Sequence, residues 1–217
     1  MAIDRTSALK TAEILLQIKA IQLQPETPFT WASGWKSPIY CDNRVLLSYP
    51  EHRRYVQAQL AEVIQRNYGR PDLIAGVATG AVAIGALVAD LLELPFVYVR
   101  PEAKEHGRKN QVEGHLGRGM HTVVVEDLVS TGNSSLRAVG ALREAGAHVE
   151  GMVAIFTYGF PQAEAAFAQA ECRLETLSDY THLLEQAVQT SFIRPEELEL
   201  LATWRKAPSE WTGVPLS

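Results

Sequence analysis

Short runs of Val, Ile and Leu alternate with helical stretches through the middle of the chain, and this alternation constrains the fold most strongly. The apolar runs are Leu73–Val77, Phe96–Arg100, Thr122–Glu126, Val149–Thr157 and Arg173–Leu177. The helical stretches are Ala81–Leu92, Ser134–Ala145 and Gln162–Ala170. Strands of continuous apolar character separated by helices are typical of a parallel sheet covered on both faces. The sequence therefore predicts an α/β fold with a doubly wound parallel sheet.

The two ends of the chain predict further helices around a less regular segment. Four apolar residues of the N-terminus fall on one helical stripe: Leu9, Ala12, Leu16 and Leu23. They predict one amphipathic helix over this stretch. Residues 25–49 keep no helical period and contain several prolines, so short strands and turns are expected there. Pro50 begins a predicted helix that ends at Gly69, and Asp179 and Pro195 mark the starts of two C-terminal helices.

Composition and charge exclude several classes of function. The formal charge of −5 would repel nucleic acid and anionic membranes, so neither is expected as a partner. No stretch of the sequence reaches the roughly 18 to 20 apolar residues of a membrane span, and polar residues interrupt the N-terminus, which argues against a signal peptide. Two distant cysteines, Cys41 and Cys172, suit a reducing compartment. We expect a cytoplasmic protein with a single domain over residues 1–217.

The richest chemistry lies between His121 and Ser134. A predicted buried strand ends in two adjacent carboxylates, Glu126 and Asp127, and runs directly into a Ser/Thr/Gly turn that opens a helix. Ligands of open α/β folds bind at such strand ends. Backbone N–H groups and hydroxyls of Ser130–Ser134 suit a phosphate monoester, whereas the carboxylates suit vicinal hydroxyls or hydrated Mg²⁺. A sugar phosphate with a free diol explains both halves.

A purely structural explanation of this run is also available. Asp127 could cap the next turn, and Ser130–Ser134 could be an ordinary capped loop. Two carboxylates at the end of an apolar strand cost desolvation that a cap does not need, so we favour the ligand site.

A polar stretch of roughly twenty residues, 101–120, separates two of the predicted strands. It contains lysines, arginines and four glycines, and it has no aromatic residue. A loop of this length in a compact domain is usually functional, most often as a lid. The spacing of His106, His115 and His121 fits no common metal site, so we expect no metal site from these three histidines.

The stretch Val123–Ser134 resembles the phosphoribosyl-diphosphate (PRPP) binding motif of type I phosphoribosyltransferases. Within that superfamily the chain is similar to orotate phosphoribosyltransferases, from about residue 9 to about residue 190. Val99–Gly107 resembles the mobile catalytic loop of that family. Phe29–Arg44, which contains an S-G-x-x-S-P-x-Y pattern, resembles the hood that closes over the base, and Ala75–Gly80 resembles the diphosphate loop.

The resemblance implies a type I phosphoribosyltransferase fold in which residues 1–49 form a helix and a small N-terminal hood and residues 101–120 form a mobile catalytic loop. It implies transfer of the ribose 5-phosphate group of PRPP to orotate, which gives orotidine 5′-monophosphate and diphosphate in pyrimidine (UMP) biosynthesis. It also implies Mg²⁺ as the cofactor. A homodimer that shares the loop across its interface is expected from the family and from the frequency of two-fold oligomers.

The resemblance also assigns roles to individual residues. The implied catalytic residues are Lys104, Arg100, His106 and Asp127. The implied PRPP-binding residues are Arg100, Lys104, His106, Glu126, Asp127, Leu128, Val129, Ser130, Thr131, Gly132, Asn133 and Ser134. Orotate is expected to contact Ser130, Lys36, Tyr40 and Phe29. Mg²⁺ is expected to have no direct protein ligand and to be held by the diphosphate and the ribose, with water contacts to Glu126 and Asp127.

The chain departs from the family pattern where many members have a cation. It has Ala32 and Pro101 where many members have lysines. Many members also have a lysine near the position of Thr79, and an arginine at the strand end where this chain has Tyr158. The residue that binds the orotate carboxylate therefore stays open, with Lys36, Arg44 and Tyr158 as the candidates. Two other functions also stay open: transfer to a different base, and PRPP or nucleotide sensing without turnover. Lys104 favours catalysis, because a sensor has no leaving group to stabilise.

Overall fold

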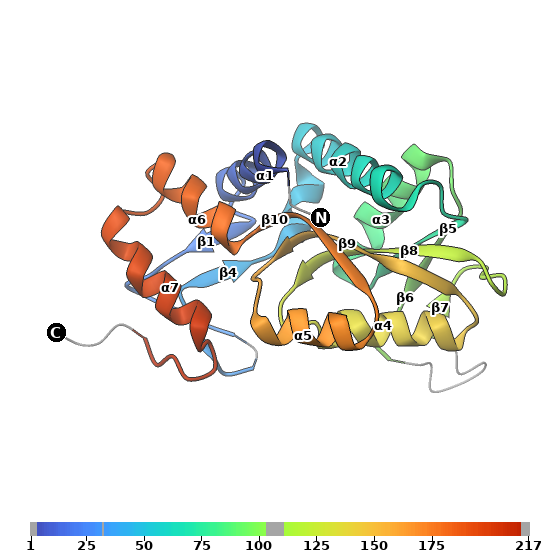
Figure 1. Ribbon diagram of the computed structural model, residues 1–217. Helices are drawn as coiled ribbons and strands as arrows, with labels where there is room; N and C mark the ends of the chain where they lie inside the picture. The colour runs from blue at the N-terminus through green and yellow to red at the C-terminus, as the bar shows by residue number, and fades with distance from the viewer. Residues whose placement is uncertain (1–3, 32, 103–110, 214–217) are drawn as a thin grey trace.

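A six-stranded sheet forms the centre of the fold in a computed structural model that describes residues 4–31, 33–102 and 111–213 (Figure 1). The sheet order is β10-β9-β8-β5-β6-β7. The strands are β5 (Leu73–Val77), β6 (Phe96–Val99), β7 (Val112–Glu113), β8 (His121–Val129), β9 (His148–Thr157) and β10 (Arg173–Asp179). The five strands from β10 to β6 pair in parallel, and β7 pairs antiparallel with β6. The predicted parallel sheet is confirmed.

Helices cover both faces of this sheet (Figure 1). On one face lie α1 (Arg5–Gln17), α2 (Pro50–Tyr68) and α3 (Gly80–Leu92), and on the other lie α4 (Asn133–Glu144) and α5 (Pro161–Gln169). Because both faces are covered, the inner strands are mostly buried, and every residue of β5 is buried. Continuous apolar runs are therefore required where an open sheet would alternate apolar and polar residues.

The N-terminal segment corrects one prediction. The helix expected to continue to Leu23 ends at Gln17, because Lys19 adopts a left-handed conformation with φ of 57°. Residues Ile21–Leu23 instead form β1, which pairs antiparallel with β4 (Ile39–Cys41). Short strands β2 (Phe29–Thr30) and β3 (Lys36–Ser37) pair with each other, and the 3-10 helix η1 (Asn43–Ser48) leads into α2. The expected strands and turns are confirmed in this segment.

The C-terminal part packs against the N-terminal segment through aromatic rings. It consists of α6 (Tyr180–Gln189), the 3-10 turn η2 (Pro195–Glu197) and α7 (Leu198–Lys206). The predicted cap is present, since the Asp179 carboxylate accepts a hydrogen bond from the backbone N–H of His182. Trp204 of α7 is fully buried, and its ring lies 5.7 Å from those of Trp31 and Tyr158. Within the described ranges, each helix is too short or too polar to cross a bilayer.

Candidate active site

The predicted site segment lies where β8 passes into α4. The strand expected to end at Glu126 continues to Val129, because its ladder with β9 runs on to the Val129–Thr157 pair. The turn therefore begins at Ser130. This turn, like Glu126 and Asp127 before it, lies toward the carboxyl edge of the parallel sheet, where open α/β folds bind ligands.

Gly132 shapes the start of α4. It is the N-cap residue and adopts φ of 84°, which favours glycine. A Cβ there would also lie 3.0 Å from the Phe167 ring. No side chain of the described residues caps this helix end, so its first N–H groups stay available to an anion. An ordinary side-chain-capped loop does not describe this turn.

Glu126 and Asp127, which we call the acidic pair, differ in their surroundings. Glu126 is 4% exposed, and its carboxylate accepts hydrogen bonds from the Ser135 hydroxyl at 2.8 Å and from the Asp127 N–H at 3.0 Å. Burial, followed by the charge of Asp127, raises the pKa of Glu126 well above its usual range. Burial also raises the pKa of Asp127, which is less buried than Glu126. Glu126 is therefore held in place, and Asp127 is the more accessible carboxylate.

Two elements outside β8, η1 and α3, position Asp127. Asn43 of η1 donates a hydrogen bond from its side-chain amide to the Asp127 carbonyl oxygen at 2.6 Å. The first residue of α3 is Gly80, and a Cβ on Gly80 would lie 2.2 Å from the Asp127 carboxylate. Only a glycine therefore lets α3 begin against this carboxylate, whose negative charge is favourable at a helix N-terminus. Gly80 is the last residue of the stretch that resembles the diphosphate loop, and in the structure it lies against a carboxylate of the same chain.

The N-terminal segment forms a cavity of about 250 Å³ beside this turn, which we call the Tyr40 cavity. Its lining residues are Thr30, Trp31, Tyr40, Cys41, Leu128, Ser130 and Tyr158. Two of the residues expected to contact orotate, Ser130 and Tyr40, thus share one cavity, and the Phe29 ring lies 5.6 Å from that of Tyr40. The fourth, Lys36, donates a hydrogen bond to the Thr30 hydroxyl at 2.8 Å.

Two candidate contacts of the base have other roles in the structure. Arg44 forms an ion pair with Asp42 at 2.7 Å, although its charge still acts on Asp127. Tyr158 is 2% exposed, and burial raises the pKa of its hydroxyl well above the usual range, so it stays a neutral hydrogen-bond donor. A neutral phenol therefore occupies the strand end at which the family resemblance suggests an arginine.

Arg100 lies near the helix end of the same site. Arg100, Ser134 and Arg137 line one small cavity of about 50 Å³, together with Ala78 and Gln111. The backbone N–H of Arg100 donates to the Gln111 carbonyl at 2.9 Å, which joins the start of the 101–120 stretch to its middle. Lys104 and His106 lie outside the described residues.

Sequence reasoning missed three residues that the structure adds to this site, Asn43, Ser135 and Arg137, and it missed the contact of Gly80 with Asp127. Ser135 and Arg137 follow the motif directly on α4, so extending the motif by one helical turn would have found them. Asn43 and Gly80 reach Asp127 from distant parts of the chain, and no local spacing indicates either.

A larger cavity lies elsewhere. It has a volume of about 770 Å³, is mostly apolar, and opens between α6 and α7 beside Tyr180 and Leu184. None of the predicted site residues lines it. We therefore place the candidate site at the β8–α4 turn, where the polar groups converge.

Comparison with known proteins identifies the family of this chain. The phosphoribosyl transferase domain family matches residues 51–187. The orotate phosphoribosyltransferase of Porphyromonas gingivalis is 56% identical over 200 residues, which cover 92% of this chain and 95% of that protein. This chain belongs to the orotate phosphoribosyltransferase family. The resemblance predicted from the motifs is confirmed, and the family is one of transferases.

Solved structures confirm the type I phosphoribosyltransferase fold for this member of the orotate phosphoribosyltransferase family. The crystal structure of orotate phosphoribosyltransferase from Aeropyrum pernix matches with a TM-score of 0.73 and 31% identity, covering 82% of this chain and 98% of that chain. The structure of Leishmania donovani UMP synthase matches with a TM-score of 0.78 and 27% identity, covering 91% of this chain. The chain spans 42% of that longer protein.

Proposed function

We propose that this protein transfers the ribose 5-phosphate group of PRPP to orotate and releases diphosphate and orotidine 5′-monophosphate. One observation supports this most strongly: the acidic pair and the open N-terminus of α4 meet at the end of β8, and Ser130 between them lines the Tyr40 cavity. A phosphate site, a diol site and a base-sized cavity thus share one turn. In this proposal residues 1–49 act as the hood and residues 101–120 as the catalytic loop of one domain.

The 5-phosphate would bind at the turn before α4. Ser130–Ser134 offer hydroxyl groups and the first N–H groups of the helix, which together suit a dianionic phosphate. The left-handed Gly132 directs the chain into the helix without a side chain over these donors.

The acidic pair fits a ribose diol and a hydrated Mg²⁺ ion. Asp127, the more accessible carboxylate, would accept hydrogen bonds from the ribose hydroxyls, while Ser135 keeps Glu126 in position behind it. Two adjacent carboxylates with raised pKa values gain from a nearby cation. When bound, Mg²⁺ would neutralise charge on the diphosphate oxygens, held by the diphosphate and the ribose with waters to Glu126 and Asp127.

The diphosphate would lie on the Arg100 side of the turn. Arg100, which forms an ion pair with Glu113 at 3.7 Å, and Arg137 line the small cavity next to Ser134, so two guanidinium groups lie there besides the residues of the loop. The family resemblance adds Lys104 and His106 from the loop, with the loop shared across a homodimer.

Orotate would occupy the Tyr40 cavity. A volume of about 250 Å³ suits a single planar ring rather than a whole nucleotide. Phe29 and Tyr40 offer aromatic faces to such a ring, and the neutral hydroxyl of Tyr158 and the ammonium of Lys36 are the candidate donors to its carboxylate.

The reaction depends mainly on positioning the two substrates and on stabilising the charge that develops on the leaving group. Displacement at the anomeric carbon passes through an oxocarbenium-like state, so the protein need form no covalent bond. Asp127 would fix the ribose in line with the base, and Arg100, Lys104 and His106 would stabilise the charge of the departing diphosphate. Closure of the loop would exclude the water that could otherwise attack the ribose.

A base panel tests the proposal. The purified chain is incubated with PRPP, Mg²⁺ and equal amounts of orotate, uracil, adenine and hypoxanthine, and the nucleotide products are separated. We expect orotidine 5′-monophosphate as the main product. A different nucleotide would support transfer to another base, and PRPP binding without any product would support sensing without turnover.

A further inference from the structure

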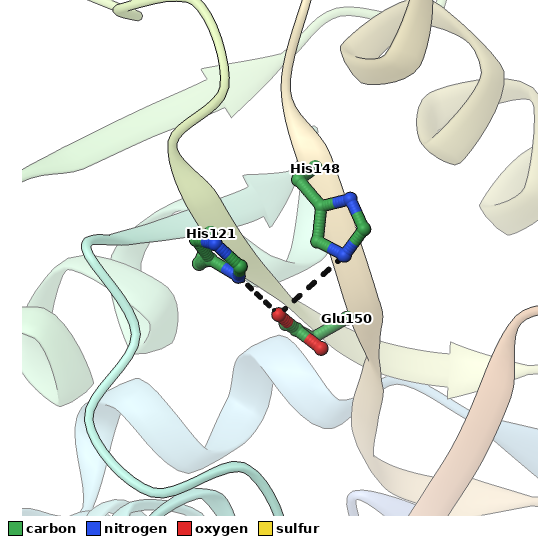
Figure 2. Close-up of side chains that lie close together, drawn as sticks. All are labelled: His121, His148 and Glu150. Atoms are coloured by element: carbon green, nitrogen blue, oxygen red, sulfur yellow. Dashed lines mark hydrogen bonds and ion pairs between the residues drawn. The ribbon is translucent and has the colours of Figure 1, made fainter.

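A second cluster of polar side chains lies at the opposite end of β8 from the acidic pair. Figure 2 shows His121, His148 and Glu150 pointing toward one another. His121 is the first residue of β8 and His148 the first residue of β9, and the two are partners in the parallel register. Glu126 follows His121 by five residues, or roughly 16 Å along the strand. The cluster is therefore separate from the proposed reaction.

The strand register explains why the three side chains meet. Glu150 follows His148 by two residues and so projects from the same face of β9. The ladder is irregular at this point. Thr122 pairs with Val149, but the next residue of β8 pairs with Gly151, so Glu150 has no partner on β8 in this register. Such a bulge changes the direction of a side chain at a strand end.

The geometry is close to that of a metal site. The candidate ligand atoms of the three residues all lie within 4.8 Å of one another. Nε2 of His148 lies 3.7 Å from Oε1 of Glu150, and Nδ1 of His121 is hydrogen-bonded to the same oxygen. With bonds of about 2.0 to 2.2 Å to a tetrahedral zinc ion, neighbouring ligand atoms stand about 3.4 Å apart. Small side-chain rotations suffice to reach that arrangement.

We propose that His121, His148 and Glu150 bind one divalent ion of the Zn²⁺ type at the amino edge of the sheet, with water completing the coordination. Two imidazoles and a carboxylate are the ligands that Zn²⁺ prefers, whereas Mg²⁺ and Ca²⁺ prefer oxygen ligands throughout. The carboxylate of Asp72, which accepts a hydrogen bond from the backbone N–H of His121 at 2.8 Å, adds negative charge near the three side chains.

The ion would replace a surface ion pair. Without metal, Glu150 raises the pKa of His121 through their hydrogen bond, and the two side chains are 32% and 58% exposed. The ion would displace the proton from His121 and join the starts of β8 and β9. Its effect is therefore expected on stability rather than on turnover.

Zinc titration of the untagged full-length chain, in the absence of PRPP, tests this site. Calorimetry with ZnCl₂ is expected to give one ion per chain, and His148→Ala and Glu150→Gln should each weaken binding by at least about tenfold, a loss that even outer-shell changes can cause. The matched control is His52→Ala, because His52 lies on α2 outside the cluster. It should bind zinc like the parent.

Melting temperatures with and without zinc give a second readout. Zinc should raise the melting temperature of the parent and of His52→Ala but not that of His148→Ala, while all three should melt alike in a chelator. Unchanged zinc affinity in both cluster variants, or no zinc binding by the parent at a concentration of about 1 mM, well above working affinities for such sites, would overturn the proposal.

Discussion

Replacing Gly80 with alanine tests whether α3 positions Asp127 for catalysis. The new Cβ would lie 2.2 Å from Oδ2, 2.3 Å from Cγ and 2.4 Å from Oδ1 of Asp127, so every end atom of that side chain is too close. An ordinary carbon contact needs about 3.5 Å, so the carboxylate has to move by more than about 1 Å. A flexible side chain can do this by rotation, and the fold should survive. A shift of this size can cost about 10²-fold in rate, which is the loss we expect in kcat/KM for PRPP.

The assay is the initial rate of orotate loss at varied PRPP, with circular dichroism to confirm folding. Gly140→Ala is the matched control, because Gly140 lies in α4 and a Cβ there meets nothing within 4 Å. A double-mutant cycle with Asp127→Asn isolates the mechanism: once Asp127 is changed, Gly80→Ala should cost little more. The reasoning is refuted if Gly80→Ala keeps the parent kcat/KM, or if its loss is equally large in the Asp127→Asn background.

Three further predictions concern single side chains. Glu126→Gln should raise the melting temperature at neutral pH, because burial raises the pKa of the Glu126 carboxyl in the folded protein and its charged form therefore lowers the free energy of unfolding. This increase in melting temperature should vanish once the pH falls below the usual pKa range of a glutamate, where the carboxyl is protonated in both states. Tyr158→Phe should raise KM for orotate and leave KM for PRPP unchanged in steady-state kinetics, since Tyr158 lines the Tyr40 cavity but not the small cavity beside Arg100. Trp204→Ala should lower the free energy of unfolding by about 3 to 5 kcal/mol in urea. Trp204→Phe should cost less, because the buried Nε1 finds no hydrogen-bond partner within the described part of the chain.

Local patterns in the sequence predicted the central sheet well. Each inner strand is largely apolar on both faces. Its own residues therefore predict a parallel sheet covered on both faces, even when the neighbouring strands are not known. The N-terminal helix shows where such patterns fail. Leu23 continues the helical period, yet Ile21–Leu23 pairs with Ile39–Cys41, and a strand partner so far along the chain leaves no local signal.

The candidate site likewise has parts that the local sequence predicts and parts that it does not. The acidic pair and the turn before α4 are contiguous, so the motif identifies them at once. Asn43 and Gly80 act on Asp127 across 84 and 47 positions of the chain, and only the folded structure places them there. The cluster of His121, His148 and Glu150 likewise depends on the register between β8 and β9, which the sequence around His121 does not indicate.

The most direct test of the central claim is the change in orotate absorbance when PRPP and Mg²⁺ are added, measured for the parent, Asp127→Asn and Lys104→Ala. The account predicts that the parent consumes orotate and releases one diphosphate for each orotate lost. It predicts a loss of about 10²- to 10³-fold in kcat for Lys104→Ala, as for other preplaced charges, and a comparable loss for Asp127→Asn. A parent that binds PRPP but leaves orotate untouched, or an Asp127→Asn variant as fast as the parent, would contradict the account.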